Sequence, residues 1–181
     1  IKEVHKSIKE IYSDIKKILE DQKIGEKIRD GFRVSIIGEV NVGKSSLLNL
    51  LSKRDVAIVS EEKGTTRDVI ETYLNIDGYP VILADTAGIR KSKNEVEKKG
   101  ILLAINKSKE ADLNIILIDN TKKKINEKVY NLINENSIVV LNKSDINNKK
   151  NHNLKDAILI SVKNNKNIDN LIKKIKDKLN K

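Results

Sequence analysis

The hydrophobic residues at the start of the chain follow a helical period. Their spacing alternates between three and four residues, with charged side chains between them, and the stripe consists of Ile1, Val4, Ile8, Ile11, Ile15 and Ile18. A stripe this narrow is typical of a helix that packs along a partner helix, and packing on its own domain is the alternative. Because the stripe breaks at residues 21–25, we expect a helical segment over 1–24 and a separate domain over 25–181.

From Arg33 onward, short apolar runs alternate with helical periods. Strands are predicted at 34–37, 69–76, 79–84, 113–118, 138–141 and 157–160, and helices at 45–52, 95–109, 125–134 and 168–179. Asp77-Gly78 between two of the runs predicts a hairpin turn. Since strands otherwise alternate with helices, we expect an α/β fold with a mostly parallel, six-stranded sheet covered on both faces.

Composition narrows the class of protein. The longest apolar runs, 101–105 and 115–118, are far shorter than the roughly 18 residues of a membrane span, so no membrane partner is expected. The absence of Cys excludes disulfides and thiol catalysis and fits a reducing compartment, which we take to be the cytoplasm. Since Met is also absent, including at position 1, we expect a piece of a longer chain.

The charge balance leaves two interpretations open. The chain carries 36 basic and 26 acidic residues, for a net charge of +10, and residues 147–181 hold ten Lys against three Asp. Lys, Ile and Asn share AT-rich codons, so codon usage by itself raises the Lys content, and one interpretation is a solvated surface. The other is a patch that follows a phosphate backbone. A single Phe and no Trp provide little surface on which bases could stack.

The segment from Gly38 to Ser45 matches the phosphate-loop pattern G-x-x-x-x-G-K-S. It follows a predicted strand and begins a predicted helix, which is the context that the pattern requires. Backbone N–H groups in such a loop bind the α- and β-phosphates, Lys44 neutralises the β- and γ-phosphates, and the Ser45 hydroxyl binds Mg²⁺. The residues expected to bind the triphosphate are Asn41, Val42, Gly43, Lys44, Ser45 and Ser46.

A second polar segment, Asp85-Thr86-Ala87-Gly88, ends the strand that follows the hairpin. We expect Asp85 to hold Mg²⁺ through water and Gly88 to bring its backbone N–H against the γ-phosphate. Thr65 and Thr66 lie between the phosphate loop and the hairpin, where one hydroxyl can reach Mg²⁺ while the γ-phosphate is present. Loss of that phosphate would release the segment, so we predict a switch.

The base is predicted from Asn142-Lys143-Ser144-Asp145, which follows another strand. The Asp145 carboxylate can accept two hydrogen bonds from guanine N1–H and N2–H₂. Adenine lacks this pair of donors and would leave the carboxylate unpaired, which costs on the order of several kcal/mol. Asn142 is expected to tie the loop and touch the base, and the stem of Lys143 to cover one base face.

The next predicted strand ends in Ser161-Val162-Lys163. The backbone N–H of Val162 is expected near guanine O6, and Lys163 over the second base face. Three motifs in this order predict a Ras-like, P-loop GTP-binding domain.

The residue that positions the attacking water is not evident. Many GTPases have Gln after the Asp-x-x-Gly motif, but here Ile89 stands there and cannot orient water. Glu95 and Glu97 are candidates, and the alternative is that both are acids that favour a helix start. Two arginines, Arg67 and Arg90, are either arginine fingers or ordinary surface residues.

Taken together, these residues resemble the MnmE (TrmE) family of bacterial tRNA-modification GTPases over about residues 20–181. The matching stretches are Gly25-Glu26-Lys27-Ile28, Asn41 to Asn49, Ala57-Ile58-Val59-Ser60, Gly64 to Asp68, Asp85 to Arg90, Glu95-Val96-Glu97 and Gly100-Ile101. The first three GTPase motifs are shared with the Era and Der GTPases, and the run from Asp85 into Glu97 is specific to the resemblance with MnmE.

The resemblance implies a G domain inserted in a helical domain, which would account for the apolar stripe. It also implies that K⁺ drives transient dimerisation of G domains across the nucleotides, with K⁺ held by Asn41, Ser60, Glu62 and Thr65. Thr66 would be the Mg²⁺ threonine, and Glu97 the residue that orients water, through a second water. Glu97, Lys44 and Thr66 are thus the expected catalytic residues, and tRNA and an MnmG-type flavoprotein the partners of the longer protein.

The chain departs from the family in places. Glu39-Val40 stands where Arg-Pro is usual, Ser60 replaces Thr, and Val162 replaces Ala. Glu39 adds negative charge near the phosphates and could weaken affinity. A ribosome-assembly switch of the Era or Der type that binds rRNA is the alternative function, and a nucleotide-binding protein without turnover is a third hypothesis, which intact Lys44, Ser45 and Asp85 disfavour.

Overall fold

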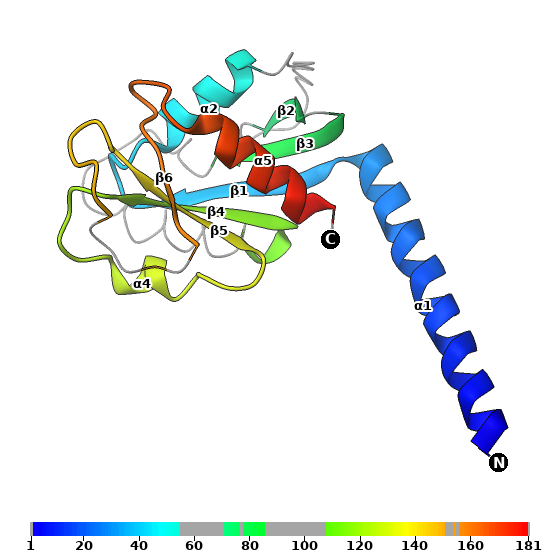
Figure 1. Cartoon of the computed structure of the whole chain (residues 1–181). Coiled ribbons are helices and arrows are strands. Elements are labelled where there is room, and N and C mark those ends of the chain that lie inside the picture. Colours follow the sequence, from blue (N-terminus) through cyan, green and yellow to red (C-terminus); the bar gives the residue numbers. More distant parts are fainter. Residues whose placement is uncertain are drawn as a thin grey trace. The chain divides into compact units, whose positions relative to one another are not determined.

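The computed structural model describes residues 2–54, 71–76, 78–85, 108–150, 154 and 156–180. The chain forms two compact units, Ile1–Gly31 and Phe32–Lys181, and each is described by itself (Figure 1). In the part of the chain that the structure describes, no helix is long and apolar enough to cross a membrane.

The first unit consists of one helix, α1 (Lys2–Asp30). It continues past residue 24, so the break in the apolar stripe over residues 21–25 does not end the helix. Gly31 ends it with a left-handed backbone at φ 92° and donates its N–H to the Lys27 carbonyl over 2.8 Å. Ile8, Ile11 and Ile15 of the stripe are exposed at 58%, 58% and 53%.

The second unit contains a six-stranded sheet in the order β2-β3-β1-β4-β5-β6. The strands are β1 (Phe32–Gly38), β2 (Glu71–Ile76), β3 (Tyr79–Asp85), β4 (Leu113–Asp119), β5 (Ser137–Asn142) and β6 (Ile158–Leu159). All neighbouring pairs are parallel except the β2–β3 hairpin, in which Ile76 pairs with Tyr79. The expected α/β fold and hairpin are confirmed.

Apolar side chains are buried on both faces of the sheet. Figure 1 shows α2 and α5 on one side of the sheet and α4 on the other. On one face, α2 (Lys44–Arg54) and α5 (Ile168–Leu179) pack with Leu47, Leu51, Leu171 and Ile175 against the strands. On the other, Val129 of α4 (Glu127–Tyr130) packs with alternate residues of β4 and β5. Every residue of β4 is buried, including the polar residues Asn114 and Asp119.

The helix predicted over 125–134 is wrong in its length, because α4 has a single turn. Asn126 caps its start by accepting the Lys128 N–H over 3.0 Å. From Leu132 onward the backbone N–H groups bond carbonyls three residues back, and the Asn134 side chain accepts the Asn136 N–H over 2.9 Å. Asn side chains that bond nearby backbone compete with helical bonds, so the apolar period alone did not indicate the end. The helix predicted over 95–109 lies outside the described residues except at its end, where 108–110 are helical.

Four polar segments meet at the carboxyl edge of this sheet. The strands β1, β4 and β5 end at Gly38, Asp119 and Asn142, and β6 ends at Leu159. A polar segment follows each of them. Because the strands are parallel, their carboxyl ends lie at one edge, where open α/β sheets bind ligands.

Candidate functional site

The loop from Gly38 to Lys44 is shaped as an anion site. Asn41 and Gly43 adopt left-handed backbone at φ 62° and 105°, and α2 begins immediately afterwards. Successive amides in such a loop can point toward one ligand, and the start of α2 adds its positive dipole end. The Lys44 ammonium lies across the loop and donates to the carbonyls of Gly38 and Glu39 over 2.9 and 2.7 Å.

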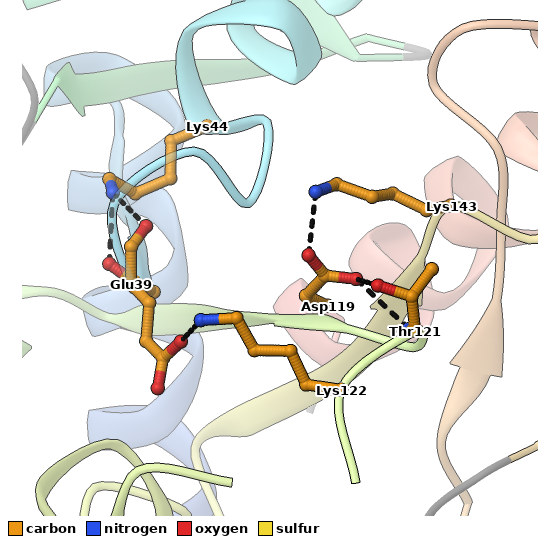
Figure 2. A network of polar contacts seen from close by, with 7 residues as sticks. Glu39, Lys44, Asp119, Thr121, Lys122 and Lys143 are labelled. Atoms are coloured by element: carbon orange, nitrogen blue, oxygen red, sulfur yellow. Dashed lines mark hydrogen bonds and ion pairs between the residues drawn. The ribbon is translucent and has the colours of Figure 1, made fainter. Parts of the chain in front are cut away.

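The acidic residue that departs from the family pattern is paired. The Glu39 carboxylate forms an ion pair with Lys122, in the segment after β4 (Figure 2). Both side chains are partly exposed, so the pair adds at most about 1 kcal/mol of stability. Its larger effect is on charge, because a cation from another strand end compensates the carboxylate beside the phosphate loop.

Asn142 joins two loops of the site, as expected. Its amide nitrogen donates to the Val42 carbonyl over 2.8 Å, and its amide oxygen accepts the Val162 N–H over 3.1 Å. A Cβ on Gly43 would lie 2.6 Å from this amide nitrogen, so only glycine fits beside it. Contact between Asn142 and a base stays a prediction.

Asp145 is exposed and held by one serine. Its carboxylate accepts the Ser161 hydroxyl over 2.6 Å. This hydrogen bond lowers the pKa of Asp145, and Lys163 and Lys143 lower it further, against a smaller rise from burial. The carboxylate is therefore ionised at neutral pH, the state that the predicted hydrogen bonds from guanine require.

Lys143 is held from the end of β4. Its ammonium donates to the Asp119 carboxylate over 2.6 Å, and Asp119 also accepts the N–H and hydroxyl of Thr121 over 2.9 and 2.6 Å (Figure 2). Burial raises the pKa of Asp119, but the hydrogen bonds from Lys143 and Thr121 outweigh it and hold the pKa below its usual value. Sequence reasoning did not identify Asp119, Asn120 or Thr121, although polar residues directly after the apolar run 115–118 were an available signal.

These segments surround a cleft of about 620 Å³. Nine of the predicted residues line it: Asn41, Val42, Gly43, Ser46, Asn142, Lys143, Asp145, Val162 and Lys163. Asn49, Leu50, Lys53 and Ile146 line it as well and were not predicted. An open cleft between a phosphate loop and an ionised carboxylate suits a ligand with phosphates at one end and a polar base at the other.

The residues expected around Mg²⁺ are only partly described. Asp85 ends β3 in register with Ile36 of β1, and Ser45 is exposed in the first turn of α2. A carboxylate at this edge and a hydroxyl after the phosphate loop are oxygen donors of the kind that Mg²⁺ prefers, so the donor set fits. The remaining predicted residues lie outside the described part of the chain: Ser60, Glu62, Thr65, Thr66, Gly88 and Glu97, with Arg67, Ile89, Arg90 and Glu95.

Comparison with known proteins identifies relatives that are GTPases. The sequence model of the family described as 50S ribosome-binding GTPase matches residues 33–143. The tRNA modification GTPase MnmE of Pelagibacter ubique is 59% identical over 149 residues, which are 82% of this chain and 34% of that protein. The MnmE of Rickettsia bellii is 43% identical over 184 residues, which are 98% of this chain and 41% of that protein. The chain therefore spans little more than a third of the length of these relatives.

Solved structures of GTP-binding proteins share the fold. A GTP-binding protein from Sulfolobus solfataricus, in complex with GDP, matches with a TM-score of 0.61 and 19% identity over 96% of this chain and 60% of its own. The translation elongation factor SelB from Methanococcus maripaludis, in complex with the GTP analogue GppNHp, matches with a TM-score of 0.58 and 21% identity. The match covers 82% of this chain and 34% of the SelB chain. At this level of identity the likeness shows a fold only.

Proposed function

The chain belongs to the family of 50S ribosome-binding GTPases and is a GTPase, and from this premise we propose that it is the G domain of an MnmE-type tRNA modification enzyme. The observation that carries the proposal is 59% identity to one MnmE, together with a cleft lined by nine of the residues that we predicted for GTP. GTP hydrolysis would time the modification of the tRNA wobble uridine (U34) in the longer protein.

Different residues among those described would bind the phosphates and the base of the nucleotide. The amides from Asn41 to Ser46 take the phosphates, and Lys44 exchanges its two carbonyl partners for the β- and γ-phosphates. Asp145 accepts the two guanine donors, and Val162 presents its N–H to O6. Adenine would leave Asp145 unpaired, so the site discriminates against ATP.

The metal ions would be held by residues at the phosphate end. Ser45 and Thr66 would hold Mg²⁺ directly and Asp85 would hold it through water, while K⁺ would be held by oxygens of Asn41, Ser60, Glu62 and Thr65. When bound, the two cations supply the positive charge that stabilises the transferring phosphoryl group. Of the K⁺ set only Asn41 is described, and its side chain is exposed next to the phosphate loop.

Glu97 is proposed to orient the attacking water, through a second water, because Ile89 cannot. Two G domains come together transiently across their nucleotides when K⁺ is present. In the longer protein, tRNA and an MnmG-type flavoprotein are the partners. We place the protein in the cytoplasm, which the absence of Cys supports.

The test is GTP turnover in K⁺ against equimolar Na⁺. We expect K⁺ to raise turnover of the wild type, and Glu97→Ala to lose nearly all turnover while it keeps GDP affinity, since a residue that orients water contributes little to binding. Glu95→Ala is the matched control, a nearby acid expected to retain turnover. Equal rates in the two salts would refute the K⁺ proposal, and loss of turnover in Glu95→Ala alone would assign the role to Glu95.

The alternative is a ribosome-assembly switch of the Era or Der type. The basic excess over residues 147–181 favours it, since lysines that neutralise phosphates release counterions from RNA. Tight binding of this chain to rRNA that weakens steeply with salt, joined to turnover independent of K⁺, would support this function over tRNA modification.

A further inference from the structure

The polar segment at the end of β4, residues 119–121, reaches toward the base-recognition loop from outside the three GTPase motifs. We propose that Asp119 is a positioning residue: it holds the Lys143 ammonium so that the lysine stem lies along the base side of the cleft, and it thereby sets the affinity for guanine nucleotides. The proposal deepens the proposed function and rests on guanine-nucleotide binding by this cleft.

The geometry gives Asp119 a full set of partners. One carboxylate oxygen accepts Lys143 over 2.6 Å, and the other accepts both donors of Thr121 over 2.9 and 2.6 Å (Figure 2). The side chain of Asp119 is 8% exposed, so these bonds also compensate its burial. A carboxylate held through both oxygens presents one fixed acceptor to Lys143.

Holding the ammonium matters because the lysine stem is flexible. A free Lys side chain loses rotamer entropy when a ligand orders it. Lys143 lines the cleft, and its side chain is 29% exposed. Asp119 fixes the far end of the Lys143 stem before the ligand binds. The side chain that contacts the base is therefore already ordered, and less rotamer entropy is lost on binding.

The same strand end holds the loop by a second route. Asn120 is fully buried, and its amide nitrogen donates to the carbonyls of Asn147 and Lys149, both over 2.8 Å. Its backbone N–H donates to the Asn142 carbonyl over 3.0 Å. Asn120 thus holds the backbone of the loop, while Asp119 holds the side chain that faces the ligand.

The cations near Asp119 have separate partners. Lys122 forms its ion pair with Glu39, while Lys143 bonds Asp119 (Figure 2). The carboxylates of the two pairs lie at different strand ends, Glu39 after β1 and Asp119 at the end of β4, so a substitution of Asp119 removes no carboxylate from the Glu39 pair. A substitution at 119 therefore tests Lys143 in particular.

The experiment is a double-mutant cycle on GDP affinity, measured by calorimetry with the 181-residue chain. Asp119→Asn keeps the shape but removes the charge, and Lys143→Met keeps an apolar stem without the ammonium. We expect Asp119→Asn to raise the Kd for GDP about ten-fold in the wild type, a typical loss for a charge-assisted bond, and less than about two-fold in the Lys143→Met background. Equal factors in both backgrounds, or a wild-type Kd for Asp119→Asn, would overturn the proposal.

Two further variants keep the result interpretable. Asp112→Asn neutralises an acid just before β4 that accepts the Arg33 N–H over 2.8 Å, and it should leave the Kd for GDP unchanged. If Asp119→Asn fails to fold, Thr121→Val removes one bond to Asp119 at an exposed position, and it should raise the Kd about three-fold; no rise would contradict the proposal. A wild type that binds ATP as tightly as GTP would instead refute the proposed function.

Discussion

A single hydrogen bond has the largest effect on the pKa of Asp145, the residue on which the proposed selection of guanine depends. The Ser161 hydroxyl is the main reason that the pKa of Asp145 lies below its ordinary value of 3.8. A carboxyl whose pKa is depressed keeps its charge well into the acid range, and the contribution of that charge disappears only as the pH falls through the lowered pKa. Guanine binding should therefore persist to a lower pH than an Asp with an ordinary pKa would allow.

Ser161→Ala removes this hydrogen bond. We expect the pKa of Asp145 to rise toward its ordinary value, so that GDP affinity falls off at a higher pH than in the wild type. The measurement is the carboxyl carbon shift of Asp145 by NMR, followed with pH. Ser137→Ala, at the start of β5, is the matched control. Identical titration midpoints of Asp145 in Ser161→Ala and in the wild type would show that another group sets this pKa.

The junction of β1 with the phosphate loop depends on close contact between two strands. A Cβ on Gly38 would lie 2.3 Å from the Leu117 carbonyl oxygen of β4 and 2.9 Å from a Val42 methyl. Neither the backbone of a central strand nor a buried valine can yield this space without a shift of the loop. The glycine therefore lets the sheet and the phosphate loop approach each other.

Gly38→Ala should destabilise the protein by about 1–3 kcal/mol, as overpacking of a core does, and should weaken GDP binding strongly. Denaturant unfolding and calorimetry measure the two effects. Gly25→Ala is the matched control, since nothing lies within 4 Å of its Cβ position in α1, and Ala favours a helix over Gly by about 1 kcal/mol. Wild-type stability in Gly38→Ala would show that the strands can separate at no cost.

The chain as a whole divides into a helix and an enzyme unit. In the part that the structure describes, both clusters of buried apolar side chains are drawn from residues 32–181. The exposed isoleucines of α1 suit a neighbouring helix, and we propose that this helix belongs to the longer protein. The nucleotide-binding unit then has its own core.

A chain of residues 32–181 should therefore fold and bind GDP with the affinity of the full chain. Its thermal unfolding midpoint, measured with and without GDP, should match that of the nucleotide-binding transition in the 181-residue chain. Aggregation of the shorter chain, or loss of GDP binding, would show that α1 contributes to the folded core.

Much of this protein follows from patterns between near neighbours in the chain. A run of apolar residues such as 115–118 indicates a buried strand, and G-x-x-x-x-G-K-S after a strand indicates a phosphate site, because period and local backbone geometry act over a few residues. The length of α4 was not predictable in this way, since several Asn side chains compete with its backbone bonds, and the apolar period does not report that competition.

Contacts between distant strand ends depended on the assembled sheet. Asp119 and Lys143 are 24 residues apart, and Glu39 and Lys122 are 83 apart. They meet because the parallel register brings the carboxyl ends of β1, β4 and β5 to one edge. Local pattern could specify the motifs and their order along the chain, but which side chains fix them in place followed from the spatial order of the strands, which no local period encodes.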